Sequence, residues 1–337
     1  MPSSSVKVVF GGLVPGYPLP KLEEFLSVLE KGGVKDIDTA QMYFDSEKLL
    51  GDVHAASRFS IDTKHIGGAE PGESTKEKVI ARGEKSLANL QTKSVSAVSI
   101  YLMKKKVDKE LQVDVFYIHA PDRNYPIEDT LAGINELYKA GKFKRFGLSN
   151  FYANEVEDVI RVCKEKNFVL PSVYQGNYSA MARKLETDIF PTLRKHNISF
   201  YAYSPIAGGF LAKTKDQIMN PEAAGRWSPE TFLGKMYQAL YNKPALLTAL
   251  DTWGKISEES GIPRFELAYR WVAYNSFLKN ELGDAVIVGA SRAEQLQGTL
   301  DALKHGPLSE EIVEKINGIW KSIEQDAPFD NMDFMLK

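Results

Sequence analysis

The stretch Asp38-Thr39-Ala40-Gln41-Met42-Tyr43 follows the strand-like run Val34–Ile37 and supplies a carboxylate and a phenol close together in the chain. Two later strand-like runs also end on polar residues, since Lys64 closes one of them and His119 closes another. An Asp, a Tyr, a Lys and a His at the ends of successive strands can form a proton-donating site suited to the reduction of a carbonyl group. We therefore expect these four side chains to converge.

The pattern around this stretch is regular. Short runs rich in β-branched and aromatic residues alternate with amphipathic stretches of helical period. The expected strands are Val6–Phe10, Val34–Ile37, Phe59–Thr63, Val113–Ile118, Phe143–Leu148, Val173–Gln175, Ser199–Tyr203 and Ala285–Val288. The expected helices are Leu22–Lys31, Lys76–Leu90, Ile127–Ala140, Ala153–Lys166, Glu186–His196 and Arg264–Asn275, and Ser291 is expected to cap a helix that ends near Leu303.

This alternation predicts an α/β fold, a (β/α)8 TIM barrel made by a single domain over residues 1–337. A doubly wound parallel sheet is the alternative. It is weakened because Gly11-Gly12, after the first strand, lacks the spacing of the Gly-rich dinucleotide fingerprint. In a barrel the carboxyl ends of the strands share one face, where active sites lie, so the four polar residues would meet there.

Two segments interrupt the alternation. Ala207–Ala249 is a long connection after the seventh strand, which predicts a functional loop or a small helical insert before the C-terminal helices. Val95–Gln112, before the fourth strand, is an atypical insertion. Its first residues can be encoded by GTAAGT and its last by CAG, which are splice-junction sequences. A translated intron and a genuine surface insertion both stay open, and either would lie opposite the carboxyl ends of the strands.

The composition bounds the function. The chain is 43% hydrophobic and 26% charged, which is typical of a soluble globular protein. Its net charge of −2 predicts no nucleic-acid or membrane partner, and no apolar run approaches a membrane span. The single Cys163 excludes an internal disulfide. With only one cysteine we also expect no Cys-based metal cluster and no bound metal. Residues Met1–Ser5 lack the features of a signal peptide, so we expect a cytoplasmic protein.

The four residues at the strand ends match the demands of carbonyl reduction, which needs a hydride on carbon and a proton on oxygen. A Tyr43 hydroxyl would donate the proton, and a Lys64 ammonium beside it would lower the phenol pKa from its usual value of about 10. Asp38 would keep Lys64 charged, and His119 would hydrogen-bond to the carbonyl oxygen of the substrate. Taken singly, each residue also has a purely structural explanation, such as a solvated strand end.

These residues and several further motifs resemble the aldo-keto reductase family, closest to its aflatoxin-aldehyde-reductase branch. The motifs are His119-Ala120-Pro121-Asp122-Arg123, Gly147-Leu148-Ser149-Asn150-Phe151, Tyr174-Gln175-Gly176-Asn177-Tyr178, Ala202-Tyr203-Ser204-Pro205 and Ala207-Gly208-Gly209-Phe210-Leu211. The resemblance implies the NADPH-dependent reduction of small aldehydes or ketones, often by a homodimer. It implies that Ser149, Asn150 and Gln175 bind the nicotinamide carboxamide and that Tyr203 stacks on the nicotinamide ring. Without it, Asn150 could cap a helix and Tyr203 could pack in the core.

The resemblance also implies contacts with the rest of the cofactor. The residues concerned are Ser204, Gly209, Leu211, Gly289, Ser291, Arg292 and Gln295. Ser291 and Arg292 at a helix start would suit a 2′-phosphate and so favour NADPH over NADH. Gly298 and Thr299 stand where the family pattern has Glu-Asn, which is a departure near the adenine. Arg226, in the long loop, would meet an acidic substrate tail.

The sequence leaves two other functions open. A redox-sensing auxiliary subunit, similar to the potassium-channel β-subunits, would keep the barrel and the cofactor but serve as a binding partner with little turnover. An isomerase or aldolase could use Lys64 as a Schiff base. That reading leaves Asp38 and Tyr43 without a ready role.

Overall fold

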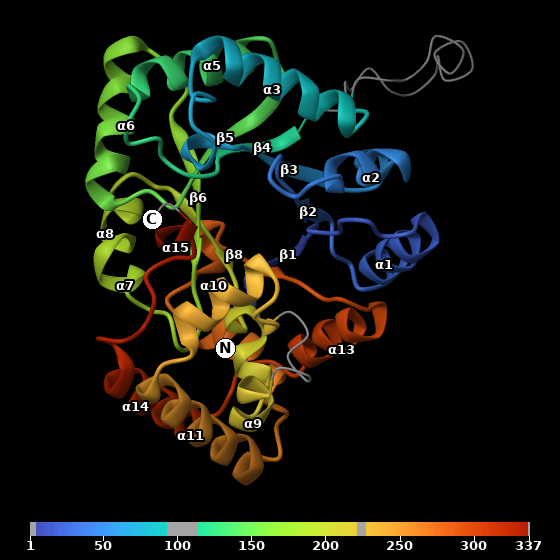
Figure 1. Ribbon diagram of the computed structural model, residues 1–337, viewed down its shortest axis with the longest axis vertical. Helices are drawn as coiled ribbons and strands as arrows, with labels where there is room; N and C mark the ends of the chain where they lie inside the picture. Colours follow the sequence, from blue (N-terminus) through green and yellow to red (C-terminus); the bar gives the residue numbers. More distant parts are fainter. Residues whose placement is uncertain (1–4, 93–112, 221–226, 336–337) are drawn as a thin grey trace. The chain divides into compact units, whose positions relative to one another are not determined.

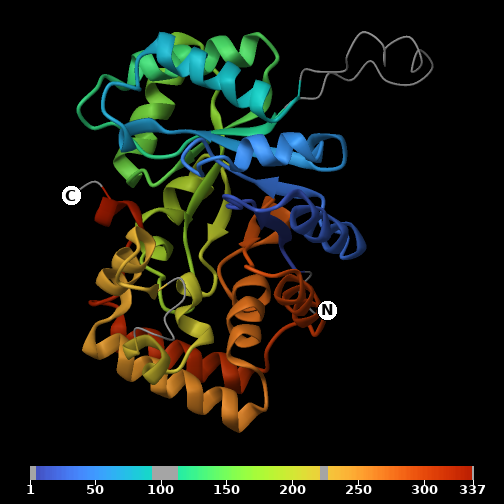
Figure 2. The ribbon, with the colours of Figure 1, turned by 45° about the vertical axis from the view of Figure 1, so that its right-hand side comes forward.

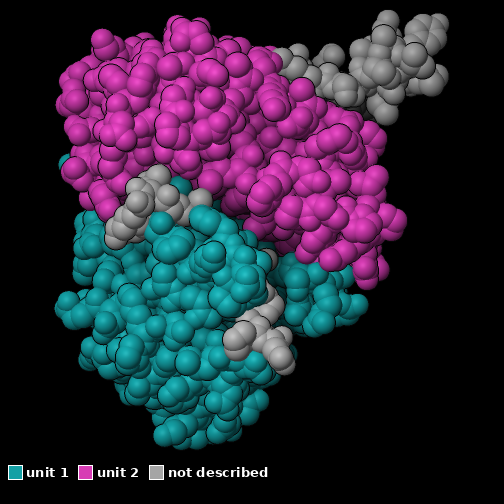
Figure 3. Space-filling model, in the orientation of Figure 1, with its two compact units in different colours: residues 1–8, 174–337 teal, residues 9–173 magenta. Residues whose placement is uncertain are grey.

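The computed structural model describes residues 5–92, 113–220 and 227–335 of the chain. Parallel strands β1 to β8 follow one another in the order of a closed barrel, with helices between them (Figure 1). The chain therefore has the predicted (β/α)8 barrel fold. It divides into two compact units, here called the N-terminal unit (Val9–Val173) and the C-terminal unit (Met1–Val8 with Tyr174–Lys337), which Figure 3 colours separately.

The N-terminal unit carries the first half of the alternation. Its elements are β1 (Lys7–Gly11, begun in the C-terminal unit), α1 (Leu19–Lys31), β2 (Asp36–Asp38), α2 (Ser46–Asp52), β3 (Ser60–His65), α3 (Lys76–Asn89), β4 (Val113–Ile118), α5 (Ile127–Lys139), β5 (Phe143–Ser149), α6 (Ala153–Lys166) and the start of β6 (Pro171–Asn177). Short 3-10 turns lie at Ala55–Ser57 and Gly67–Ala69. In the parallel register Asp38 pairs with Asp62, and Lys64 pairs with Tyr117. The carboxyl ends of β2, β3 and β4 therefore lie side by side.

Local sequence explains how these elements form and pack. Helix α1 buries Leu22, Phe25 and Leu29 on one face, and fully burying each such side chain contributes about 1.5–3 kcal/mol. A glycine is required just after β3, because Gly67 has a φ of +61° and a Cβ there would lie 2.0 Å from the carbonyl oxygen of Ala120. This close approach joins the loops that follow β3 and β4.

The C-terminal unit carries the remaining strands and the long helical insert. Its elements are the end of β6, α7 (Leu185–Asp188), α8 (Phe190–Lys195), β7 (Ser199–Tyr203), the 3-10 segment η3 (Ala207–Ala212), α9 (Lys215–Met219), α10 (Phe232–Tyr241), α11 (Pro244–Ser260), α12 (Arg264–Arg270), a π-helical segment (Trp271–Asn275), a 3-10 turn (Asn280–Leu282), β8 (Ala285–Val288), α13 (Ala293–Lys304), α14 (Glu310–Ile323) and α15 (Met332–Met335). Strand β7 pairs with β8 through Tyr201 and Ala285. Helices α11 and α14 run side by side in Figures 1 and 2.

The structure confirms the predicted strands β4, β7 and β8 at their predicted bounds, whereas β3 extends through Lys64 to His65. The described part of the connection after β7 contains helices, as expected for a small helical insert. The prediction of one continuous helix over 186–196 is wrong. The segment is split into α7 and α8, because Pro191 lacks an N–H and fits only the first turn of a new helix. The helix predicted over 264–275 ends its α-helical part at Arg270.

The predicted insertion Val95–Gln112 lies outside the described residues, and α3 and β4 flank it. We expect a variant that lacks these residues to fold with an unchanged or higher melting temperature, because joining Ser94 to Val113 leaves a connection of ordinary length. The measurements are soluble yield and melting temperature.

A variant in which a Gly/Ser linker of equal length replaces the segment is the matched control. If the deletion variant is insoluble or much less stable while the linker variant is normal, the segment is a necessary spacer and the intron hypothesis is wrong. Sequencing of the transcripts tests the intron hypothesis directly.

Candidate active site

A buried ion pair lies at the carboxyl ends of β2 and β3. The Nζ atom of Lys64 is 2.6 Å from Oδ2 of Asp38 and 2.8 Å from the carbonyl oxygen of Thr39. The two side chains are 0% and 3% exposed, so solvent barely screens the pair. Removing one partner of such a pair typically costs about 3–5 kcal/mol, because the other charge stays buried without compensation.

Lys64 is held in its charged form. Burial lowers the pKa of this ammonium, but the carboxylate of Asp38 and then the negative charge that Tyr43 carries when ionised outweigh burial, so the pKa of Lys64 lies above its usual value. The Nζ atom lies 5.0 Å from the centre of the Tyr43 ring. A protonated ammonium therefore stands beside the predicted proton donor.

His119 completes the group from the end of β4. Its ring lies 5.8 Å from the ring of Tyr43, centre to centre, at an edge-on angle of 76°. Burial, followed by the charge of Lys64 and by His65, holds the pKa of His119 well below its usual range, so the imidazole is neutral. Its buried Nδ1 atom has no hydrogen-bond partner within residues 5–92, 113–220 and 227–335. The structure thus brings together all four residues predicted as catalytic.

Gln41, which the sequence analysis did not single out as functional, holds the loop that carries Tyr43. Its Oε1 atom accepts a hydrogen bond from the backbone N–H of Ile66 at 3.1 Å. Its Nε2 atom donates to Oγ of Ser86 at 2.9 Å and to the carbonyl oxygen of Arg82 at 3.2 Å. The loop is therefore tied to the end of β3 and to α3. The one sequence signal for Gln41 was its place between Asp38 and Tyr43.

Ser149 and Asn150, predicted to bind the cofactor, lie beside this group at the end of β5. The amide nitrogen of Asn150 donates to the carbonyl oxygen of His119 at 2.9 Å and to Oγ of Ser149 at 3.0 Å. Asn150 has a φ of +63°, a conformation that Asn tolerates better than most residues. The alternative reading of Asn150 as a helix cap is wrong, because α6 is capped at Tyr152.

The other predicted cofactor residues lie in the C-terminal unit. Gln175 is buried in β6, and Tyr203 ends β7 with its side chain half-buried. Ser204 follows with a φ of +55°, and Gly209 has a φ of +100° within η3. Leu211 has a buried side chain, and its backbone N–H bonds to the carbonyl oxygen of Ile206.

The loop between β8 and α13 carries the remaining predicted residues, Gly289, Ser291, Arg292 and Gln295. The prediction that Ser291 caps α13 is wrong, since Arg292 holds the cap position. Instead, the hydroxyl of Ser291 donates to Oε1 of Gln295 at 2.8 Å, and this local bond competes with capping. Arg292 is exposed at the start of the helix. One turn further along α13, the hydroxyl of Thr299 donates a hydrogen bond to the carbonyl oxygen of Gln295, in the same helix.

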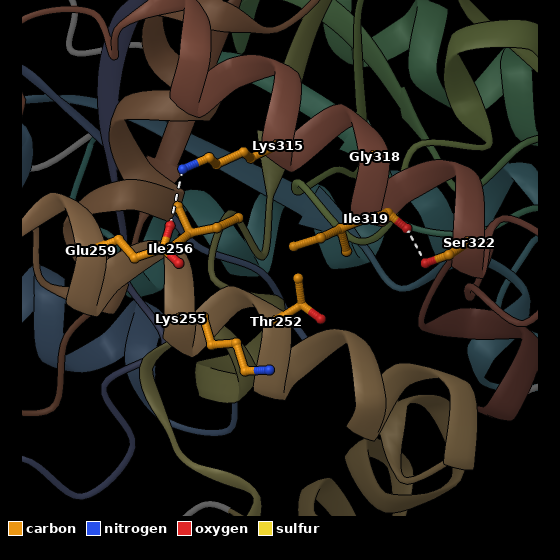
Figure 4. A pocket seen from close by; sticks show the side chains of 8 residues that line it. All are labelled: Thr252, Lys255, Ile256, Glu259, Lys315, Gly318, Ile319 and Ser322. Atoms are coloured by element: carbon orange, nitrogen blue, oxygen red, sulfur yellow. Dashed lines mark hydrogen bonds and ion pairs between the residues drawn. The ribbon is translucent and has the colours of Figure 1, made fainter.

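Other features of the described residues do not add to this group. Arg226, predicted to contact substrate, lies outside them. Within them, no cluster of His, Cys, Asp and Glu side chains could hold a metal ion, and no helix is long and apolar enough to cross a membrane. A surface groove between α11 and α14 is bridged by the ion pair of Lys315 with Glu259 at 2.9 Å (Figure 4). No residue predicted for the active site lines this groove.

Comparison with known proteins identifies the family of the chain. The model of the aldo/keto reductase family matches residues 10–321. The chain is 38% identical over 307 residues to the oxidoreductase sirO of Leptosphaeria maculans, covering 90% of this chain and 87% of that protein. It is 34% identical to the human aflatoxin B1 aldehyde reductase member 4, over 89% of this chain and 88% of that protein. The chain therefore belongs to the aldo/keto reductase family of oxidoreductases.

Proposed function

We propose that the protein reduces aldehydes or ketones to alcohols with NADPH and that Tyr43 donates the proton. The observation that carries the proposal is the group formed by Asp38, Lys64, Tyr43 and His119, in which a buried ion pair fixes an ammonium beside a half-buried phenol. One of the two relatives named above is an aldehyde reductase, which supports a carbonyl substrate. Small carbonyl compounds are the proposed substrate class.

Each side chain of the group has a separate task in this proposal. The phenol of Tyr43 transfers its proton to the carbonyl oxygen, and the Lys64 ammonium stabilises the phenolate that remains. Asp38 holds the ammonium in place and balances its charge. The neutral imidazole of His119 has one N–H to donate, which would orient the carbonyl oxygen of the substrate.

The residues predicted to hold the cofactor fit a phosphorylated dinucleotide. Arg292 is an exposed cation at the start of α13, where backbone N–H groups and the helix dipole also favour an anion. Tyr203 is a half-buried residue at the end of β7, and its aromatic ring is suited to stacking on a planar ring. When bound, the nicotinamide supplies the hydride. Ser149, Asn150 and Gln175 are the proposed carboxamide contacts.

The geometry disfavours a Schiff-base function for Lys64, because such a lysine must lose its proton to act as a nucleophile. Here the ammonium is paired with Asp38 and its pKa is raised. The redox-sensing auxiliary subunit is the remaining alternative. The proposal is tested by measuring steady-state turnover with a panel of aldehydes and ketones, with the oxidation of NADPH as the readout. If the protein binds NADPH but turns over none of these compounds, the auxiliary subunit is favoured.

Tyr43→Phe should lower kcat about 10²- to 10⁴-fold, the usual contribution of general acid catalysis, because the ring is kept and the proton is lost. The dissociation constant for NADPH should stay within about twofold, as the hydroxyl is not a proposed cofactor contact. Tyr125→Phe, which removes a hydroxyl bound to Asp129, is the matched control. Retention of more than a tenth of the wild-type kcat would remove Tyr43 from its proposed role.

Lys64→Met should lower kcat at least about tenfold and move the alkaline limb of its pH profile to higher pH, since a phenol without a neighbouring cation ionises less readily. The double variant Asp38→Asn, Lys64→Met removes both charges of the pair and controls for loss of stability. It should recover the melting temperature but not the activity. An unchanged pH profile in both folded variants would contradict the role of Lys64.

Arg292→Ala should weaken NADPH roughly tenfold and NADH much less, because only NADPH has a 2′-phosphate for the guanidinium to meet. Lys304→Ala, at the other end of α13, removes an exposed cation without touching the proposed phosphate site. The measurement is the dissociation constant of each cofactor. Equal weakening of the two cofactors by Arg292→Ala is the result that contradicts the assignment.

A further inference from the structure

The C-terminal segment of the chain reaches the hydroxyl of Tyr203. The backbone N–H of Asn331 donates a hydrogen bond to the Tyr203 hydroxyl oxygen at 3.3 Å, across 128 residues of sequence. The neighbouring Asp330 is 3% exposed. Burial first, and then the carboxylate of Asp330, raise the pKa of Tyr203 well above its usual value, so the hydroxyl stays protonated. The hydroxyl end of Tyr203 is thus enclosed by the tail.

The tail is anchored on both sides of this contact. Before it, Nζ of Lys243 donates to the carbonyl oxygen of Asp326 at 2.7 Å. After it, α15 packs against α10, with the rings of Phe334 and Phe232 6.1 Å apart, centre to centre. The segment 326–335 is therefore a strap that is fixed at both ends and passes over the hydroxyl of Tyr203.

The two ends of the Tyr203 side chain have different surroundings. Its hydroxyl accepts a hydrogen bond and is desolvated, whereas the residue as a whole is only half-buried. The ring is joined to the backbone through two rotatable bonds, and β7 fixes only the backbone end. Because the hydroxyl oxygen lies on the axis of the Cβ–Cγ bond, a contact at the hydroxyl holds the direction of the whole side chain, which the first of these bonds sets.

We propose that Asn331 is a positioning residue whose backbone N–H, carried by the strap 326–335, holds the side chain of Tyr203 in the direction in which its ring stacks on the nicotinamide. The proposal rests on the proposed function, in which Tyr203 is the stacking residue. It assigns to the strap a role in cofactor geometry, because a side chain already held in one direction loses less freedom when a planar ligand stacks on its ring.

The test removes each end of the hydrogen bond in turn. Tyr203→Phe keeps the ring and removes the acceptor, and Asn331→Pro removes the N–H donor. Asn331→Ala keeps that donor and is the matched control. Each binding constant is measured twice, for NADPH and for 2′,5′-ADP, which has the phosphorylated adenosine end but no nicotinamide.

Tyr203→Phe and Asn331→Pro should each weaken NADPH about two- to tenfold, the effect of one lost hydrogen bond, and leave 2′,5′-ADP unchanged. Asn331→Ala should bind both ligands like the wild type. Because the two changes act on one bond, the double variant should bind NADPH no more weakly than the single variants. Tyr203→Phe carries the test alone if the proline variant does not fold.

The proposal is overturned if Tyr203→Phe binds NADPH like the wild type, or if it weakens both ligands equally. Asn331→Ala acting as strongly as Asn331→Pro would overturn it too, since the side chain and not the N–H would then matter. Failure of the proposed function looks different. In that case the wild-type protein itself would bind 2′,5′-ADP as tightly as NADPH and would oxidise no NADPH with any carbonyl compound.

Discussion

The ion pair of Lys64 with Asp38 is the interaction on which the rest of the active site depends. Two opposite charges lie almost out of reach of water at the ends of adjacent strands, so the register of β2 against β3 sets their distance. The pair fixes more than its own two residues. Its ammonium also binds the carbonyl oxygen of Thr39, at the start of the loop that carries Tyr43, and its charge contributes to keeping His119 neutral. One pair thus sets the position or the protonation of its neighbours.

The sequence predicted the barrel and this group of four residues because both depend on local patterns. Strand runs are short and rich in β-branched residues, and a polar residue at the end of a buried run is visible without knowledge of the fold. Contacts between distant residues could not be predicted in this way. The bonds of Gln41 to Ser86 and of Asn331 to Tyr203 join residues 45 and 128 positions apart, and no spacing rule connects them. The capping error at Ser291 has another cause, because Gln295 competes for the serine hydroxyl.

The C-terminal unit differs from the N-terminal unit in how it holds its candidate residues. In the N-terminal unit each one stands on a strand end or on a short loop tied to the next strand. In the C-terminal unit Tyr203 is reached by the last residues of the chain, and those residues rest on the helical insert after β7. Two parts of the sequence that are variable in most barrels, a long loop and a tail, therefore support one aromatic residue.

The two histidines near the ion pair have a consequence for how the protein responds to its surroundings. Burial, with the charge of Arg82, lowers the pKa of His65 to about 4, and the pKa of His119 is also well below its usual value. Both imidazoles are therefore neutral throughout the range in which histidines usually change charge. With Lys64 charged over the same range, these three side chains keep the same charge between mildly acidic and mildly alkaline conditions. A change of acidity within that range therefore alters no charge on these three neighbours of Tyr43.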